Sequence, residues 1–344
     1  MNVGIVGSTG YGGVELYRLL SNHPDVNECI LYSSSLDGTS YAEEYPHLSG
    51  LSREKVKPIV TEEMHQLDFV FLAAPSGVSK TLTQKLIGKK AKVIDLSGDL
   101  RLKDPGEYEK WYKGESAPKH ILDKAVYGLT ELNREAIRDA VLIANPGCFP
   151  TATLLGLAPL FHHNPIKPNS LIIDAKTGLS GAGRKATQSS HFSETQENLR
   201  IYKVHEHQHT PEIEQQLKIW DSETGPITFS THLIPMTRGI MVTMYAELKD
   251  TSITGELHSL YHSFFERSPF IRVRQIGQFP STKEVFGTNF CDVSIKADPR
   301  TNRVTIVSAI DNLVKGAAGQ AVQNMNVMLG IDETTGLHHY PIYP

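Results

Sequence analysis

Roughly the first 145 residues alternate short, nearly uninterrupted apolar runs with segments of helical character, and no other feature constrains the fold as strongly. The apolar runs are VGIVG (3–7), ECILYSS (28–34), LDFVFLAAPSG (67–77), AKVIDLSG (91–98) and AVLIAN (140–145). Such runs are typical of strands in a parallel sheet covered on both faces, with the helices between them as crossovers. The pattern predicts a Rossmann-like, doubly wound parallel sheet, whose ligands bind at the carboxyl ends of the strands.

The pattern changes from about residue 171 onward. There the apolar runs alternate more strongly and few helical segments separate them: SLIIDAKTG, ITFSTHLIPM, GIMVTMYAELK, FIRVRQI, FCDVSIKAD and RVTIVSAID. We therefore predict a second, α+β domain with a mixed or antiparallel sheet. We also predict a final helix over 311–330, whose small residues permit close packing against the first domain. The expected domains are 1–148, completed by 311–330, and 149–310.

A glycine-rich loop follows the first predicted strand and opens a helix, in the sequence VGIVGSTGYGGVELYRLL. Its glycines Gly7, Gly10 and Gly13 have the spacing GxxGxxG, which differs from the commoner GxGxxG. Bare backbone there lets a pyrophosphate approach the helix N-terminus, where N–H groups and the helix dipole favour anions. The strand–loop–helix context predicts nucleotide binding; a tight turn without a ligand is the alternative.

The end of the second predicted strand bears on the choice of nucleotide. An NAD-specific fold usually has an acidic residue about 20 residues after the glycine loop, where it binds the ribose hydroxyls. Here the sequence reads LYSSSLDG, so Ser33 and Ser34 offer neutral hydroxyls that tolerate a 2′-phosphate. This favours NADP(H), although Asp37 lies close enough to keep NAD open.

One of the three cysteines, Cys148, lies in the run NPGCFPTATLLGLAPL. Pro146 and Gly147 end the last strand of the first domain, and Pro150 is suited to the first turn of a helix. A thiol at a helix N-terminus has a depressed pKa, and this one lies at the strand ends where a cofactor would end. Cys148 is thus either a nucleophile for acyl-level redox chemistry or, like most buried cysteines, an inert packing residue. Cys29 and Cys291 lie inside predicted strands, and we expect them to be packing residues.

Three histidines alternate in YKVHEHQHTPEIEQQL (202–217). They lack the helical i, i+4 spacing of a zinc protease and no other ligand cluster accompanies them, so we predict no metal site. Thr210 as N-cap and Pro211 at the first helical position predict that His209 stands just before a helix. A histidine there is held rigidly enough to serve a thiol as acid and base, whereas solvent-exposed loop histidines are the alternative.

Composition excludes several other classes of protein. The net charge of −4, from 34 Lys and Arg against 38 Asp and Glu in 344 residues, implies no nucleic-acid or membrane-surface partner. No apolar run reaches the ~18 residues of a membrane span. The N-terminus enters a strand at once, so we expect neither a signal nor a transit peptide. Three cysteines without a CxxC pair suggest a reducing compartment, and we predict a cytoplasmic protein.

With these residues in place, the chain resembles the N-acetyl-γ-glutamyl-phosphate reductases, the NADP-dependent semialdehyde dehydrogenases of arginine biosynthesis. The resemblance covers essentially the whole chain, and its most specific block is IANPGCFPTATLLGLAP (143–159). Further blocks in the family's usual order are GSTGYGG, KTGLSGAGR (176–184), HTPEI, HLIPMTRGI (232–240) and DNLVKGAAGQAVQ.

The resemblance implies Cys148 as the acyl-accepting nucleophile and His209 as its acid/base partner. It implies that the cofactor phosphates are wrapped by Ser8, Thr9, Gly10, Tyr11 and Gly12. Asn312 would hold the nicotinamide carboxamide, and Ser180, Gly181 and Ala182 would lie beside the nicotinamide. The weaker expectations are substrate contacts from Arg101, His207, Glu212 and Arg238. Forked guanidinium groups suit a carboxylate and an acyl phosphate, but the two arginines also fit ordinary surface ion pairs.

The implied reaction is the NADPH-dependent reduction of N-acetyl-γ-glutamyl phosphate to the 5-semialdehyde and phosphate, through a cysteine thioester. A related reductase of aspartyl or aminoadipyl phosphate is the nearest alternative. A cysteine hydrolase or acyltransferase without a redox step, and a nucleotide-binding regulatory module with a structural cysteine, are alternatives of other classes. The resemblance also implies a homodimer or homotetramer with a small acyl phosphate as substrate.

Overall fold

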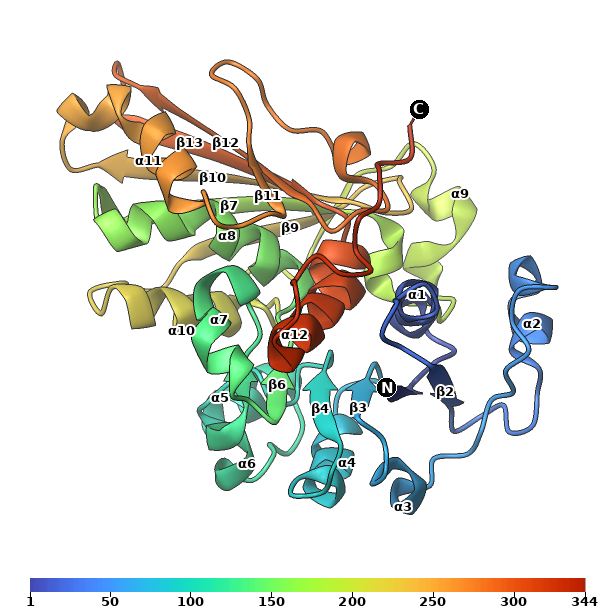
Figure 1. Cartoon of the computed structure of the whole chain (residues 1–344). Coiled ribbons are helices and arrows are strands. Elements are labelled where there is room, and N and C mark those ends of the chain that lie inside the picture. Colours follow the sequence, from blue (N-terminus) through green and yellow to red (C-terminus); the bar gives the residue numbers. More distant parts are fainter. Residues whose placement is uncertain (344) are drawn as a thin grey trace. The chain divides into compact units, whose positions relative to one another are not determined.

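The apolar runs of the first half form six strands of one sheet, in the order β2-β1-β3-β4-β6-β5 (Figure 1). Every neighbouring pair in this sheet is parallel. The structure is a computed structural model that describes residues 1–343. The strands are β1 (Asn2–Val6), β2 (Glu28–Tyr32), β3 (Phe69–Leu72), β4 (Lys92–Asp95), β5 (Val126–Tyr127) and β6 (Leu142–Ala144). The predicted Rossmann-like parallel sheet is therefore confirmed.

Seven helices connect these strands, and most of them are short. The central strands consist of apolar residues without polar alternation, which suits strands that are covered on both faces. In β3, for example, all four residues are buried. Buried leucines on one side of a helix such as α1 pack against them. The helices are α1 (Tyr11–Leu20), α2 (Tyr41–Glu44), α3 (Thr61–Met64), α4 (Ser79–Leu86), α5 (Pro105–Tyr112), α6 (Lys119–Lys124) and α7 (Thr130–Arg138).

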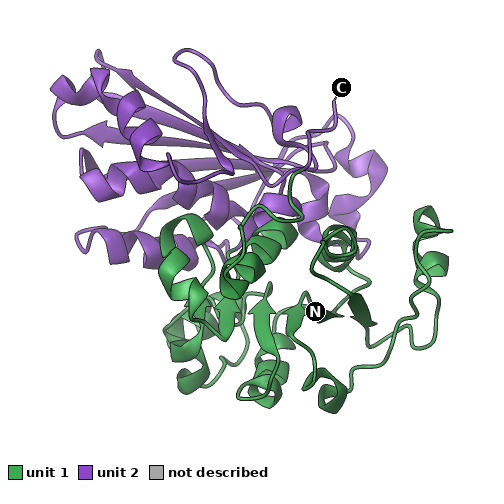
Figure 2. Cartoon of the chain, in the orientation of Figure 1, with its two compact units in different colours: residues 1–146, 317–338 green, residues 147–316, 339–344 purple. Residues whose placement is uncertain are grey.

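The chain divides into two compact units (Figure 2). The first contains residues 1–146 and 317–338, so that the last helix, α12 (Gly319–Leu329), belongs to it. Buried amides of α12 pack on this unit: Asn324 donates to the carbonyl of Gly128 (2.8 Å) and to the side chain of Asn145 (3.0 Å), and accepts from the hydroxyl of Thr130 (2.7 Å). Such a buried, satisfied network ties α12 firmly to the sheet.

The helix predicted over 311–330 is wrong in its first part. The α-helix begins only at Gly319, after a π-helical turn at Val314–Ala318. The physical reason is Asp311, whose carboxylate accepts from the amides of Leu313 (2.9 Å) and Val314 (3.2 Å) and so competes with helical bonding. The carbonyl of Asp311 accepts from the amide of Gly316 (3.0 Å), a bond that spans five residues.

The second unit contains residues 147–316 and the tail from His339. Its seven-stranded sheet has the order β11-β12-β13-β10-β7-β9-β8 and mixes parallel with antiparallel pairs, as predicted. The strands are β7 (Ile166–Thr177), β8 (Arg200–Tyr202), β9 (Thr228–Leu233), β10 (Ile240–Leu248), β11 (Ile271–Val273), β12 (Cys291–Asp298) and β13 (Arg303–Ile310). The helices are α8 (Cys148–His163), α9 (Phe192–Thr195), α10 (Thr210–Trp220) and α11 (Leu257–Phe264).

Helix α8 lies at the centre of this unit. It is apolar all round, as the LLGLAPL run requires, and residues 149–161 are all buried. It packs on β7, β10, β12 and β13, and both α10 and α11 pack on it in turn. Along β10, every second residue is buried, whereas the residues on the other face of the strand are only partly buried. This arrangement places the N-terminus of α8, with Cys148, at a fixed point of the second unit.

Two further predictions concern the remaining cysteines and the membrane. Cys29 lies in β2 and Cys291 in β12, and both are buried, which confirms them as packing residues. None of the helices between residues 1 and 343 is long and apolar enough to cross a membrane.

Candidate active site

The predicted nucleotide loop connects β1 to α1 in the first unit. Gly7 has a φ of +80°, and a Cβ there would lie 2.5 Å from the carbonyl oxygen of Ala73, so no side chain fits at this turn. The first intrahelical bond runs from Val14 to the carbonyl of Gly10 (3.0 Å). The amides of Tyr11, Gly12 and Gly13 therefore form the N-terminal turn of α1, the arrangement that favours a bound phosphate. The residues present fit a dinucleotide.

The end of β2 meets this loop, as a cofactor site requires. The amides of Gly7 and Ser8 both donate to the carbonyl of Tyr32 (3.0 and 3.2 Å). Beyond Tyr32, the hydroxyl of Ser33 lies 3.4 Å from the hydroxyl of Thr9, while Ser34 is exposed. Thr9, Ser33 and Ser34, all predicted as cofactor residues, thus gather at one edge of the sheet.

Two tyrosines that the sequence analysis missed support the nucleotide loop from behind. The hydroxyl of Tyr41 donates to the carbonyl of Ser8 (2.7 Å), and that of Tyr45 donates to the carbonyl of Thr9 (2.9 Å). Their rings contact each other edge to face, 5.2 Å between centroids, and Tyr17 of α1 contacts Tyr41 in the same way. The signal available in the sequence was the i, i+4 tyrosine pair in SYAEEYP, within a segment that shows no strong periodicity.

Arg101 lies in the first unit, after β4, and is almost fully buried. Its Nε donates to the carbonyl of Asn145 (2.8 Å) and its Nη2 donates to the carbonyl of Leu96 (2.8 Å). Arg101 is therefore no surface ion-pair residue: its guanidinium fixes the backbone just before the Pro146-Gly147 turn. The contact with substrate stays a prediction.

Cys148 is the first residue of α8 in the second unit, as the sequence predicted from the Pro-Gly turn and Pro150. Gly147 occupies the N-cap position, where its carbonyl accepts from both the amide and the hydroxyl of Thr151 (2.9 Å each). The Gly147 amide donates to Oε1 of Glu212 (2.9 Å). Cys148 itself is only partly buried, unlike the other two cysteines. The thiol thus stands at the positive end of a long helix, where the dipole stabilises a thiolate.

The π-helical turn at Val314–Ala318 packs directly against this cysteine. A Cβ built on Gly316 would lie 2.8 Å from the Cβ of Cys148 and 3.3 Å from its Cα. Only glycine fits in that space, so the turn restricts the position of the Cys148 side chain. The sequence analysis recorded the small residues here as a means of helix packing and missed their contact with Cys148.

Two of the three histidines lie beside the start of α8. The ring of Phe149, the residue after Cys148, contacts His207 and His209 edge to face, with centroids 5.4 and 6.1 Å apart. The two imidazole rings are 4.9 Å apart, and the amide of His209 donates to Nδ1 of His207 (3.2 Å). His207 and His209 are 3% and 9% exposed, so the alternative of solvent-exposed loop histidines is wrong for both; it holds for His205.

The predicted start of α10 is wrong by one residue. The helix begins at Thr210, with His209 in the cap position and Pro211 at the second helical position. The Thr210 amide donates to the carbonyl of His207 (2.9 Å), which already closes a turn ahead of the helix, and the buried hydroxyl of Thr210 makes no hydrogen bond that would cap the helix. The carbonyl of His209 accepts from the amide of Ile213 (3.1 Å), so His209 takes part in the first backbone hydrogen bond of α10.

Burial separates the chemical roles of the groups around Cys148. Burial, with a smaller contribution from the charge of Lys203, lowers the pKa of His207 to about 3, so this imidazole is neutral at physiological pH. Burial and, secondarily, the negative charge of Cys148 raise the pKa of Tyr202, whose ring contacts His207 at 5.7 Å. Tyr202 was not predicted as a site residue; it lies on β8, a strand too short to be recognised from its sequence.

The remaining predicted cofactor residues lie close together after the C-terminal end of β7. Nδ2 of Asn312 donates to the hydroxyl of Ser180 (3.0 Å), and its Oδ1 accepts from the amide of Gly239 (2.7 Å). Gly181 lies in the same 3-10 turn as Ser180, at Leu179–Ala182. Arg238, which precedes Gly239, pairs with the buried carboxylate of Asp311 (3.7 Å). The structure therefore brings Ser180, Gly181, Asn312 and Arg238 together within the second unit.

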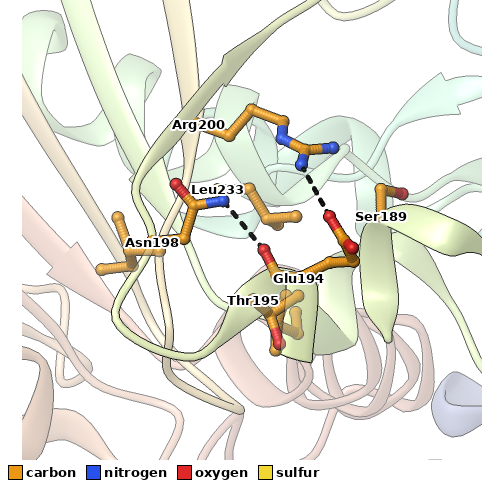
Figure 3. A pocket seen from close by; sticks show the side chains of 8 residues that line it. Ser189, Glu194, Thr195, Asn198, Arg200 and Leu233 are labelled. Atoms are coloured by element: carbon orange, nitrogen blue, oxygen red, sulfur yellow. Dashed lines mark hydrogen bonds and ion pairs between the residues drawn. The ribbon is translucent and has the colours of Figure 1, made fainter. Parts of the chain in front are cut away.

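A separate pocket lies beside Ser189, Glu194, Thr195, Asn198, Arg200 and Leu233 (Figure 3). Arg200 and Glu194 form an ion pair of 3.9 Å across it, and Asn198 donates to the carbonyl of Glu194 (2.8 Å). None of the predicted site residues lines this pocket, so we do not assign the chemistry to it. Within residues 1–343, no three or more His, Cys, Asp or Glu side chains are placed to hold a metal ion.

Comparison with known proteins defines the class. Residues 2–140 match the family model of the semialdehyde dehydrogenase NAD binding domain, and residues 148–312 match that of the semialdehyde dehydrogenase dimerisation domain. The fold is similar to that of aspartate semialdehyde dehydrogenase II from Vibrio cholerae (TM-score 0.72, 18% identity, 96% of this chain and 98% of that one). It is also similar to aspartate semialdehyde dehydrogenase from Candida albicans (TM-score 0.71, 15% identity, 95% and 98% covered). Fold and site together define a semialdehyde dehydrogenase.

Curated relatives narrow the class further. The N-acetyl-gamma-glutamyl-phosphate reductase of Bacillus subtilis is 61% identical over 345 residues, which cover 100% of both chains. Those of Geobacillus kaustophilus and Halalkalibacterium halodurans are 57% and 56% identical, again over 100% of both chains. The chain belongs to the N-acetyl-gamma-glutamyl-phosphate reductase family.

The contact between Gly316 and Cys148 predicts a specific loss of activity. Gly316→Ala places a methyl group where only 2.8 Å separates it from the Cβ of Cys148, so either the turn or the thiol must move. We expect kcat to fall about 100-fold or more, because a displacement near 1 Å has that effect on a positioned reactant. The measurement is kcat together with the rate of Cys148 alkylation. Gly255→Ala, where a Cβ meets nothing within 4 Å, is the matched control and should leave both unchanged; equal loss in the two variants would contradict the account.

The depressed pKa of His207 predicts part of the pH dependence of stability. The unfolded chain protonates this imidazole near pH 6.5, whereas the folded chain does so only near pH 3. Its contribution to the free energy of unfolding is therefore complete above pH 6.5 and falls with decreasing pH, by at most about 1.4 kcal/mol per pH unit. Asp95, whose buried carboxyl has a pKa raised to about 6, acts in the opposite sense. Urea unfolding of wild type and His207→Gln between pH 7 and pH 4.5 isolates the histidine: the variant should lose less stability on acidification, and parallel curves would refute the assignment.

Proposed function

We propose that this chain reduces N-acetyl-γ-glutamyl phosphate to N-acetyl-L-glutamate 5-semialdehyde and phosphate with NADPH, a step of arginine biosynthesis. The observation that carries the proposal is the partly accessible thiol of Cys148 on the first turn of α8, with the rings of His207 and His209 packed around the next residue. The names and the 55–61% identity of the full-length relatives support the choice of substrate.

The first step is acyl transfer to sulfur. The Cys148 thiolate attacks the γ-carbonyl carbon, the bond between that carbon and the phosphate oxygen breaks, and inorganic phosphate leaves. The negative charge that develops on the acyl oxygen lies at the N-terminus of α8, where backbone amides and the helix dipole stabilise it. A thioester on Cys148 is the product of this step.

The nucleotide belongs to the loop between β1 and α1 and supplies a hydride to the acyl carbon when bound. Gly7, Ser8, Thr9, Gly10, Tyr11, Gly12 and Gly13 form that loop and the first turn of the helix. The hydroxyls of Ser33 and Ser34 at the end of β2, and the lack of a carboxylate at these positions, support NADP over NAD. In the second unit, the Ser180–Asn312 pair and Gly181 are proposed to bind the nicotinamide end.

His209 is proposed to carry the proton. It gives a proton to the oxygen of the reduced acyl group, which forms the hemithioacetal, and takes that proton back as the carbon–oxygen double bond of the aldehyde forms, the carbon–sulfur bond breaks and the Cys148 thiolate leaves. Burial lowers the pKa of His207 to about 3, too low for a group that exchanges protons near pH 7. His207 instead serves as the hydrogen-bond acceptor for the backbone amide of His209. The predicted substrate contacts of Arg101, His207 and Arg238 remain predictions, whereas the complete burial of Glu212 favours a different role for that carboxylate.

The alternatives differ in substrate or in class. The fold is similar to that of aspartate semialdehyde dehydrogenases, but these are only 15–19% identical to this chain, against 55–61% for the glutamyl-phosphate reductases. An aminoadipyl-phosphate reductase has no observation in its favour. A hydrolase or acyltransferase without a redox step has no use for the nucleotide loop between β1 and α1, so the loop disfavours both alternatives.

A second copy of this chain is the proposed partner, in a homodimer or homotetramer. The family model for residues 148–312 carries the name dimerisation domain. The far face of the second sheet also supports this, because Ile172 is 39% exposed there and the neighbouring Asp174 pairs with Lys176 (2.7 Å) and His232 (3.1 Å) on the same face. We further propose that the protein acts in the cytoplasm, with a small acyl phosphate as substrate and no nucleic-acid, membrane or metal partner.

Replacing the thiol tests the proposed reaction. Cys148→Ser should reduce phosphate-dependent reduction of NADP with N-acetylglutamate 5-semialdehyde by at least about 1,000-fold, because an alcohol at this position is a far weaker nucleophile. Binding of NADPH, followed by fluorescence titration, should stay within about threefold of wild type because the loop at β1 is unchanged. Cys29→Ser is the control for a buried thiol that takes no part. Turnover that survives in Cys148→Ser would end the proposal, as would faster turnover with the aspartyl or aminoadipyl aldehyde.

A further inference from the structure

Glu212 is a carboxylate in an unusual place. It lies in the first turn of α10, and its side chain is 0% exposed. A buried carboxyl group is unfavourable unless hydrogen bonds compensate for the lost water. Its Oε1 accepts the amide proton of Gly147 at 2.9 Å, so one compensating bond goes to the backbone directly before Cys148.

The Gly147 peptide is thereby held on both sides. Its N–H points to Glu212, while its carbonyl accepts from the amide and from the hydroxyl of Thr151 at 2.9 Å each. The partner of the Gly147 carbonyl, Thr151, lies in α8, whereas the partner of the Gly147 N–H, Glu212, lies in α10. Glu212 is therefore the link that sets the first turn of α8, and with it the thiol, relative to the helix that begins at His209.

Glu212 is also poorly placed to touch a substrate. A side chain without solvent exposure reaches a diffusing molecule only if the structure around it opens, and one of its oxygens is already used by the backbone. We propose that Glu212 is a positioning residue, which holds Cys148 for attack through the Gly147 amide and makes no contact with the acyl phosphate. This inference rests on the proposed function of Cys148.

Two substitutions of Glu212 separate positioning from substrate binding. Glu212→Gln keeps the length and an oxygen acceptor for the Gly147 amide, so kcat and KM should stay within about fivefold of wild type. Glu212→Asp is one methylene shorter and withdraws the acceptor, so kcat should fall about 10- to 100-fold while KM changes less than about threefold. If Glu212→Asp does not fold, Glu212→Asn, which is equally short but uncharged, carries the same expectation.

A second readout reports on the thiol without any substrate. The rate of alkylation by iodoacetamide as a function of pH measures the reactivity of Cys148, because Cys29 and Cys291 are only 6% and 0% exposed. Glu212→Asp should lower this rate and move its pH midpoint upward, since the thiol leaves its place at the helix N-terminus. Glu212→Gln should keep the rate within about threefold of wild type.

Glu214→Gln is the matched control on the same helix. Oε1 of Glu214 accepts from the amide of Ile227 (3.0 Å), the same kind of bond but remote from Cys148 in sequence. It should leave kcat and the alkylation profile unchanged.

Three results would overturn the inference. A KM raised more than about tenfold in Glu212→Gln, at unchanged kcat, would make the carboxylate a substrate contact. A lower Tm in Glu212→Asp with wild-type kcat and alkylation would make it a purely structural residue, and losses in Glu214→Gln equal to those in Glu212→Asp would make the effect unspecific. Failure of the proposed function itself looks different, because Cys148→Ser would then retain turnover whatever the Glu212 variants do.

Discussion

The bond from the Gly147 amide to the buried carboxylate of Glu212 joins the start of α8, where Cys148 lies, to the start of α10, which follows His209. Gly147 is the last residue before α8, and Glu212 lies three residues after His209 at the start of α10. The ring of Phe149, the residue after Cys148, contacts both His207 and His209, so the proposed nucleophile and the proposed acid lie at neighbouring helix starts. Close packing of Gly316 against Cys148 further restricts the position of the cysteine side chain.

The two units contribute different kinds of structure to this chemistry. In the first unit, the glycine-rich loop after β1 presents backbone amides at the N-terminus of α1, which suits an anionic nucleotide. In the second unit, the apolar helix α8 packs on the mixed sheet, Cys148 at its start is partly buried, and His207, His209 and the Ser180–Asn312 pair are buried. Burial there lowers the pKa of His207 to about 3 and so favours the neutral imidazole.

Much of the fold followed from the sequence because the signals were strong. The five long apolar runs of the first half and the six alternating runs of the second all became strands. The strands β5 and β8, of two and three residues, carry too little periodicity to be recognised. Local polar competition caused the errors: Asp311 delays the last helix by capturing amides, and a turn at His207 draws Thr210 into α10.

For the candidate site, the sequence led to Cys148, His209 and the glycine loop, since each stands beside a recognisable turn or helix start. It did not lead to Tyr41, Tyr45 or Tyr202, whose contacts join segments far apart in the chain. The central claim is an acyl group on Cys148, and mass spectrometry of acid-quenched enzyme tests it most directly. After mixing with N-acetyl-γ-glutamyl phosphate and no nucleotide, the Cys148 peptide should carry one N-acetylglutamyl group that added NADPH removes. An unmodified Cys148 peptide, or the same adduct on another residue, would contradict the account.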